Sequence, residues 1–469
     1  MKMPLGQNGK KEETSGNKYL LWGLIAIELF MSFSFLGYFH IAPLSITFVY
    51  IPVLVAGCVL GPKASALMGI VFGLASMWKA SAFYVGAVDA IFSPISSGKP
   101  LASILLSVGS RALFGLLSGI LYQMAQKSRH PLVGVITVTS VGRTLHTLLV
   151  YGFMQLFFPE IGIGLPATWN DIRRWDFLPF LLIANGIVVG CFFYFRSEAY
   201  RRLAHRVSMV DQVNAIVPHV RKGIHVTILL VSIASFSVAL YFTNRIGSMM
   251  KSYGLNLSAR ASYDLMHLEI QFLLGILSLA FLAVLIIIIY QRNFNYLYYE
   301  AQLDGLTGLF GRQLFFQKGE ALLAEMSGDE KKPMGCFIIM DVDLFKEIND
   351  QFGHPMGDKV LRDVADELKK IFDKEGIVGR LGGDEFVVLI CEPWHRKTIE
   401  AKLNHLKKEV GKILLPAGTV TCSIGVIPVE AGYSLEELYR NADRLLYEAK
   451  KTGKNRFVFG YRYQDISEK

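Results

Sequence analysis

Long apolar stretches recur through the first 291 residues of this 469-residue chain, and they restrict its fold more than any other feature. A helix needs about 20 apolar residues to cross the ~30 Å hydrocarbon core of a bilayer. The chain is 52% hydrophobic and only 19% charged, which is too apolar for an ordinary soluble protein. We expect an all-α, multi-pass membrane domain of about eight transmembrane helices. The predicted spans are residues 19–41, 44–60, 64–85, 101–123, 132–157, 177–195, 226–242 and 270–290.

Basic residues are concentrated in this apolar part of the chain. Residues 1–299 carry a net charge of +12 and residues 300–469 carry −3. Between apolar spans, Lys and Arg mark the cytoplasmic loops of membrane proteins. The pI of about 9.1 therefore reflects membrane topology, and we expect no nucleic acid partner. An even number of spans places both termini in the cytoplasm at the inner (plasma) membrane, although five basic residues would then lie outside: Arg173, Arg174, Arg245, Lys251 and Arg260.

After residue 291 the composition becomes mixed and charged, as in a globular domain. We expect a cytoplasmic tail (1–17), a six-helix membrane domain (18–198), a basic loop with two further spans (199–291), a connecting helix (292–303) and a soluble domain (304–469). In the soluble domain the hydrophobic periodicity alternates between strand and helix, which predicts an α/β fold of the split βαβ kind. The predicted strands are 335–342, 377–381, 385–390, 419–428 and 456–459, and the predicted helices are 313–326, 357–372, 398–412 and 434–451.

Acidic residues gather at the ends of two predicted strands. Asp341 ends the apolar strand 335–342, and Asp384 and Glu385 follow a Gly-Gly hairpin. Carboxylates at neighbouring strand ends commonly hold Mg²⁺, a hard ion that also accepts phosphate oxygens. A single acid at a strand end is usually a solvated turn residue, but two clusters favour a metal site.

Several motifs of the soluble domain occur in an order that resembles the GGDEF family of diguanylate cyclases. They are DGLTGL (304–309), DVDLFKEIND (341–350), FGHPMGD (352–358), RLGGDEF (380–386), SIGV (423–426) and NAD (441–443). The resemblance implies that two GTP molecules condense to cyclic di-GMP and release two diphosphates. One active site holds one GTP, so the resemblance also implies a homodimer.

The resemblance assigns roles to individual residues. Asp341, the carbonyl of Val342 and Asp384 would bind Mg²⁺ (or Mn²⁺), and Glu385 would act at the attacking hydroxyl or at the metal. Asn349 and Asp358 would hold the guanine edge, because a carboxylate accepts from guanine N1–H and the 2-amino group. The other implied site residues are His354, which lines the nucleotide pocket, Lys346 and the backbone amides of Leu344, Phe345 and Lys346 at the phosphates, and Lys450 and Lys454 at the terminal phosphates. For Lys454, a simply solvated side chain is an equal alternative.

The sequence departs from the family pattern before the hairpin. Many relatives have Arg-x-x-Asp there, as a product-binding inhibitory site, but this chain reads DKEG at 373–376. The guanidinium that would bind guanine and phosphate is absent. We therefore predict no strong product inhibition through that site.

In the membrane part, the stretch ITFVYIPVLVAG (46–57) followed by LGPK (60–63) resembles the substrate-binding (S) components of energy-coupling-factor vitamin transporters. Small residues also promote helix packing in any bilayer protein, so packing alone is the alternative. Arg111 and Arg143 lie well inside apolar spans, with His146 about one turn beyond Arg143. Ionisable groups at that depth usually face a cavity or a partner. They indicate a site for an anionic or polar small-molecule signal, unless they snorkel or pair with an acid such as Asp89.

Together these features predict a membrane sensor that controls an active diguanylate cyclase. Two alternatives are a receptor with an inactive, nucleotide-binding cyclase domain and a transporter with a regulatory domain attached. The intact acids at 341, 384 and 385 argue against the inactive receptor. Uptake that persists after Asp384→Ala would favour the transporter.

Overall fold

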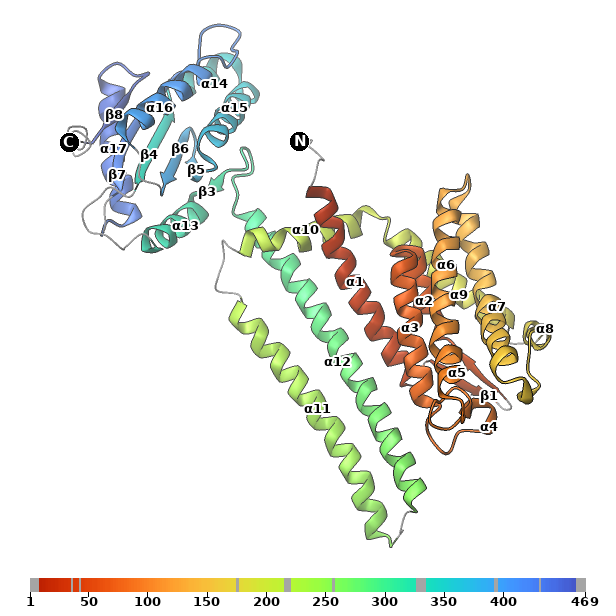
Figure 1. The fold of residues 1–469 in the computed structure, drawn as a ribbon. Coiled ribbons are helices and arrows are strands. Elements are labelled where there is room, and N and C mark those ends of the chain that lie inside the picture. The colour runs from red at the N-terminus through yellow and green to blue at the C-terminus, as the bar shows by residue number, and fades with distance from the viewer. Residues whose placement is uncertain are drawn as a thin grey trace. The chain divides into compact units, whose positions relative to one another are not determined.

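The computed structural model describes residues 8–34, 37–41, 44–173, 177–214, 221–254, 258–325, 335–391, 395–429 and 432–460. The chain divides into two compact units, which we call the helical unit (Met1–Tyr296) and the α/β unit (Leu297–Lys469). Figure 1 shows the fold. We describe each unit by itself.

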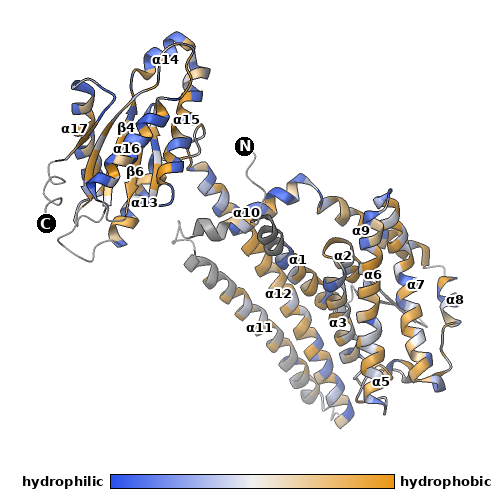
Figure 2. Ribbon diagram, turned by 45° about the horizontal axis from the view of Figure 1, so that its top comes forward, coloured by the Kyte–Doolittle hydropathy of each residue, from blue (hydrophilic) through white to orange (hydrophobic). Residues whose placement is uncertain are grey.

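Four helices in the described part of the helical unit are long and apolar enough to cross a bilayer. Hydrophobic residues predominate along these helices in Figure 2. The four helices are Pro100–Lys127, α7 (Pro131–Phe157), α9 (Phe177–Tyr194) and α12 (Ala259–Ala301). The first consists of α5 (Pro100–Ile104), a π-helical turn and α6 (Ser110–Lys127). The structure thus supports four of the eight expected spans. The other main helices are α1 (Asn8–Ser32), α2 (Tyr50–Val59), α3 (Pro62–Lys79), α10 (Glu198–Asn214) and α11 (Arg221–Ser252).

A β-hairpin explains why the first two expected spans are wrong as drawn. The helix α1 ends at Ser32, and strands β1 (Tyr38–Ile41) and β2 (Leu44–Thr47) then pair antiparallel. The helix α2 that follows has only 10 residues. Apolar composition alone predicts one long helix on each side of residues 42–43, but β-branched and aromatic residues occur equally well in strands.

Glycines let α3 and α6 approach each other backbone to backbone. A Cβ added at Gly69 would lie 2.1 Å from the Arg111 carbonyl oxygen, and one added at Gly115 would lie 2.1 Å from that of Ser65. Such close approach is the usual way in which helices pack within bilayers, where burial of apolar surface does not drive association. It fixes the position of Arg111 relative to α3.

The α/β unit is built on a six-stranded mixed sheet of order β3-β5-β6-β4-β7-β8. The central strand β4 pairs antiparallel with β6 and β7, whereas β3 with β5 and β7 with β8 are parallel. The strands are β3 (Phe310–Gly311), β4 (Gly335–Val342), β5 (Gly376–Gly382), β6 (Glu385–Ile390), β7 (Cys422–Val429) and β8 (Phe457–Phe459). The helices are α13 (Arg312–Glu325), α14 (Phe345–Phe352), α15 (His354–Phe372), α16 (Arg396–Val410) and α17 (Leu435–Lys451).

The alternation of side chains along β4 separates two cores. Ile338 and Met340 belong to the core shared with α15 and α16, and Phe337 and Ile339 belong to the core shared with α13 and α17. Successive side chains of a strand point to opposite faces, so Asp341 falls on the α17 side. The expected α/β architecture is confirmed, while the short helix α14 and strand β3 were not predicted.

Candidate functional site

The acidic ends of β4 and β6 lie side by side. Asp341 and Glu385 are directly paired in the antiparallel register, and the Val342 N–H donates to the Asp384 carbonyl oxygen at 3.4 Å. Asp341, Asp384 and Glu385 therefore share one end of the sheet, as the sequence predicted. The sheet register alone brings these three acids together.

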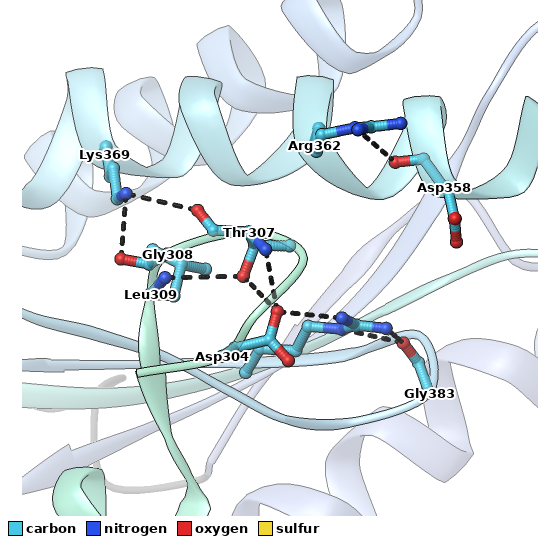
Figure 3. A network of polar contacts seen from close by, with 9 residues as sticks. Asp304, Thr307, Gly308, Leu309, Asp358, Arg362, Lys369 and Gly383 are labelled. Atoms are coloured by element: carbon cyan, nitrogen blue, oxygen red, sulfur yellow. Dashed lines mark hydrogen bonds and ion pairs between the residues drawn. The ribbon is translucent and has the colours of Figure 1, made fainter. Parts of the chain in front are cut away.

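The turn between β5 and β6 is held by an arginine that the sequence analysis gave no role. Gly382 and Gly383 have φ of 146° and 54°, a backbone that favours glycine. Arg380 donates from Nε and Nη2 to the Gly383 carbonyl oxygen at 2.9 and 2.6 Å. Its Nη1 donates to Asp304 Oδ1 at 2.9 Å (Figure 3). This clamp ties the hairpin that carries Asp384 to the start of the α/β unit.

Asp304 is the anchor of that clamp. It also accepts hydrogen bonds from the backbone N–H and the hydroxyl of Thr307, at 2.9 and 2.6 Å (Figure 3). Burial acts to raise the pKa of Asp304, but the hydrogen bonds from Thr307 and Arg380 outweigh it and hold the pKa below its usual value. The DGLTGL motif is thus a structural brace. The signal that could have revealed it is an acid followed three residues later by Thr, which forms a capped turn.

Asp341 lies in an environment that disfavours its charge. Its side chain is only 9% exposed, and Lys450 Nζ lies 2.8 Å from Oδ2. Burial raises the pKa of Asp341 to about 6, and the nearby Asp384 and Glu385 add to this rise against the opposing effect of Lys450. The pKa of Glu385 is also raised, mainly by burial and then by the nearby charges of Asp443 and Asp384. The strand ends therefore concentrate more negative charge than Lys450 neutralises, and an added cation would relieve it.

The donor set suits a hard divalent cation. Two carboxylates and a main-chain carbonyl are oxygen ligands, and Mg²⁺ keeps several waters in such sites. Within the described ranges, no group of three His, Cys, Asp or Glu side chains is arranged to hold a metal ion. A metal here would rely on the Val342 carbonyl, water and substrate oxygens for its remaining ligands. The structure places Lys450 against Asp341, beside this donor set.

Asp343, two residues further along, has a different task. Its carboxylate accepts hydrogen bonds from Thr421 Oγ1 at 2.8 Å, Ser423 Oγ at 2.6 Å and the Asn455 N–H at 2.9 Å. It is 5% exposed. These bonds connect β4 to β7 and to the loop before β8, so Asp343 supports the fold of the site.

The main chain turns sharply between β4 and α14. Leu344 has φ of 60°, a left-handed conformation that non-glycine residues rarely adopt outside functional loops. The helix α14 begins at Phe345, so the N–H groups of Phe345 and Lys346 belong to its first turn, where helix hydrogen bonds leave donors available. Lys346 is exposed. Such a helix start is suited to bind phosphate.

The predicted guanine-binding residues lie on two successive helices that meet at Gly357. A Cβ added at Gly357 would lie 2.0 Å from Asn349 Oδ1, so only glycine leaves room for this side chain. Asp358 follows directly, and its carboxylate points away from Arg362, whose Nε donates to the Asp358 main-chain oxygen at 3.2 Å (Figure 3). Asn349 thus lies against the residue that precedes Asp358, and the exposed His354 begins the same helix.

Lys454 lies in the loop that follows α17. Its φ is 60°, and its N–H donates to the Ala449 carbonyl oxygen at 3.1 Å. The next residue, Asn455, is bonded to Asp343. This loop therefore lies at the same end of the sheet as the acids.

In the helical unit, the three predicted ligand residues surround an aromatic cluster. The buried His146 ring stacks on Phe72 with centroids 5.4 Å apart and meets Phe114 edge-on at 5.3 Å. The Arg111 guanidinium lies 4.9 Å from the centroid of the same Phe72 ring, and its Nη1 donates to the Ser107 carbonyl oxygen at 3.0 Å. The Arg143 guanidinium lies over the Phe177 and Phe180 rings at 5.2 and 5.8 Å.

Two family models match the chain, one in each unit. Residues 301–456 match the model of the diguanylate cyclase GGDEF domain. The α/β unit is a GGDEF domain. Residues 24–195 match the substrate-specific component of energy-coupling-factor transporters, in agreement with the resemblance of residues 46–63. Both predicted resemblances are confirmed.

The GGDEF domain has curated relatives in several bacteria. It is 36% identical over 165 residues to the probable diguanylate cyclase DgcT of Escherichia coli, covering 34% of this chain and 35% of that protein. It is 35% identical over 167 residues to the diguanylate cyclase DgcP of Pseudomonas aeruginosa, covering 34% of this chain and 24% of that protein. The chain thus spans about a quarter to a third of these relatives. A solved GGDEF domain of DgcB from Caulobacter crescentus, in complex with c-di-GMP, is 30% identical over 34% of this chain and 93% of that one, with a TM-score of 0.32.

Proposed function

We propose that this protein is a diguanylate cyclase anchored in the inner membrane, which joins two GTP into cyclic di-GMP under the control of its helical unit. The observation that carries the proposal is the meeting of Asp341, Asp384 and Glu385 at one sheet end, next to the start of α14. The curated diguanylate cyclases at 35–36% identity support the same activity.

Each half-reaction forms a bond from a ribose 3′-oxygen to the α-phosphorus of the other GTP and breaks the bond from that phosphorus to the diphosphate. Asp341, the Val342 carbonyl and Asp384 would hold Mg²⁺ (or Mn²⁺), which supplies positive charge to the triphosphate when bound. Glu385 takes the proton of the attacking hydroxyl. The diphosphate leaves with the electron pair of the broken bond.

The remaining site residues bind and orient GTP. Lys346 and the first amides of α14 hold the phosphates, and Asn349 and Asp358 select guanine. Lys450, which is paired with Asp341 in this structure, and Lys454 would contact the terminal phosphates when GTP binds. Because one site holds one nucleotide, two copies of the chain must face each other, and the catalytic form is a homodimer.

The helical unit acts as a multi-pass sensor with its basic loops in the cytoplasm. Arg111, Arg143 and His146 bind an anionic or polar small molecule, and the match to transporter substrate-binding components favours such a role. His146 and Arg111 both contact Phe72 of α3.

The other end of α3 contacts α12. The Trp78 ring stacks on the buried His267 ring with centroids 4.6 Å apart. Just beyond α3, the Phe83 N–H donates to Asp264 Oδ1 at 2.6 Å. A ligand that shifts α3 would therefore act on α12, the helix that leads into the GGDEF domain.

The decisive experiment is incubation of the purified full chain with GTP and Mg²⁺ and detection of cyclic di-GMP. Asp384→Ala should abolish product, whereas Asp373→Asn, at an exposed acid on the same domain, should leave turnover unchanged. Equal product from the Asp384→Ala variant would contradict the metal assignment. No product from the parent, together with GTP binding, would favour the inactive receptor.

A transporter is the second candidate, because residues 24–195 match a substrate-binding component. It predicts solute uptake into cells that depends on residues 18–198 and is unaffected by Asp384→Ala. The sensor proposal predicts that the helical unit alters cyclic di-GMP production instead.

A further inference from the structure

An apolar cavity of about 240 Å³ lies in the helical unit between α1, α10 and α12. Aliphatic side chains from all three helices form its walls, among them Leu20 and Leu24 of α1, Leu203 and Val207 of α10, and Leu285 and Ile286 of α12. Three tyrosines also border it: Tyr19, Tyr194 and Tyr200. Tyrosines prefer the boundary between hydrocarbon and headgroups, so the cavity lies at the depth of a membrane interface.

The helix α10 has two different faces at this cavity. Leu203, Ala204 and Val207 line the cavity, while Arg201 and Arg202 are exposed to solvent. The single acid in its first turn, Glu198, lies 3.7 Å from Arg202, and both side chains are mostly exposed. Exposed ion pairs contribute little, so Arg202 can bind another anion. Arg201 donates from Nη2 to the Arg196 main-chain oxygen at 2.9 Å, which leaves its other guanidinium N–H groups for an anion.

A further arginine, Arg292 of α12, contacts two of the residues that line the cavity. Arg292 Nε donates to the Val207 carbonyl oxygen at 3.0 Å, which joins α12 to α10. Its guanidinium lies 5.7 Å from the centroid of the Tyr19 ring. The apolar cavity therefore has arginines on two of the three helices that form it.

We propose that this cavity binds an acyl chain of an acidic phospholipid, whose phosphate is bound by Arg201 and Arg202. An apolar cavity beside a basic, amphipathic helix matches a molecule that joins a hydrocarbon chain to an anionic headgroup. Arginine suits phosphate because its planar guanidinium donates two parallel hydrogen bonds. The proposal goes beyond the cyclase activity and requires only that the helical unit lies in a bilayer.

The test uses the full chain, purified in detergent and mixed with phosphatidylglycerol or phosphatidylcholine, and native mass spectrometry counts the lipids retained. We expect phosphatidylglycerol to be retained in preference to phosphatidylcholine. The Arg201→Gln/Arg202→Gln double variant should bind phosphatidylglycerol about tenfold more weakly. Ala204→Phe, which fills the cavity with a ring, should lose both lipids.

A matched control removes two positive charges elsewhere on the helical unit. Lys127→Gln/Arg129→Gln changes two exposed basic residues, the last of α6 and one in the loop that follows it, and should retain phosphatidylglycerol as the parent does. Equal retention by parent and Arg201→Gln/Arg202→Gln, or equal retention of both lipids by the parent, would overturn the proposal. If Ala204→Phe fails to fold, the Arg201→Gln/Arg202→Gln variant still decides the test, because both of its substitutions lie on the exposed face of α10.

Discussion

At the scale of single residues, Asp341 and Asp343 have opposite effects on the stability of the fold. Asp343 is satisfied by three hydrogen bonds and stabilises the fold, whereas Asp341 is buried beside like charges and costs stability when ionised. Active sites often lower the stability of the fold in this way, because charged groups that bind a substrate or metal repel one another when the site is empty. The two aspartates therefore provide a direct test of which carboxylate belongs to the chemistry.

Asp341→Asn should stabilise the metal-free protein and abolish activity. The pKa of Asp341 is raised from about 3.8 to about 6, so the folded protein binds a proton more tightly than the unfolded chain does. Its contribution to stability is thus present at low pH and is lost as the pH rises from about 4 to about 6. At pH 7.5 in EDTA we expect the variant to be more stable by about 1–3 kcal/mol, as measured by thermal unfolding of the full chain.

Asp343→Asn is the matched control and should destabilise the protein by about 2 kcal/mol at the same pH, since it weakens three hydrogen bonds to a buried charge. The stability difference between Asp341→Asn and the parent should shrink toward pH 4, where the parent binds the proton. A lower stability of Asp341→Asn at pH 7.5 would show that the ion pair with Lys450 outweighs burial.

At the scale of elements, the position of Asn349 depends on the close meeting of α14 and α15. Gly357→Ala places a methyl group 2.0 Å from Asn349 Oδ1, so the Asn349 side chain must move. We expect the KM for GTP to rise at least about tenfold, with a smaller effect on kcat. The reason is that the substitution weakens the binding of guanine and leaves the groups that act on the phosphate in place. Steady-state kinetics of the full chain measure this. Gly305→Ala, where the added methyl meets open space, should leave KM unchanged, and an unchanged KM in Gly357→Ala would remove Asn349 from the base site.

The sequence predicted the elements whose side-chain pattern is set by one core face. The bounds of strands β4 and β6 and of helices α15 and α17 were predicted within a few residues. In each of these segments the spacing of apolar residues fits only a strand or only a helix. Helix α14 was missed because eight residues around the acidic motif carry too short a pattern. The β1–β2 hairpin was missed because its strands have only four residues each, so the alternation of Leu44–Thr47 is too short to stand out beside the long apolar runs around it.

The contacts of the candidate site also include some that the sequence predicts and some that it does not. The pairing of Asp341 with Glu385 follows from adjacent strands and could be anticipated, and the structure brings the predicted acids together. The clamp from Arg380 to Asp304 and the support from Asp343 to Asn455 join residues 76 and 112 positions apart. Such contacts arise from tertiary packing, for which local sequence carries no signal.

At the scale of the whole molecule, the proposed sensor requires that a signal at Arg143 changes α12, the helix that leads into the GGDEF domain. His146, three residues after Arg143 on α7, stacks on Phe72 of α3, and Trp78 near the other end of α3 stacks on His267 of α12, so α3 is the proposed route. Arg143→Ala should change cyclic di-GMP production by the full chain, and Trp78→Leu should remove the dependence. In the Trp78→Leu background, Arg143→Ala should then have no further effect, a non-additivity that a double-mutant cycle measures. Trp169→Leu, at an exposed tryptophan of the same unit, should leave the effect of Arg143→Ala intact. Additive effects of Arg143→Ala and Trp78→Leu would mean that the signal reaches α12 by another route.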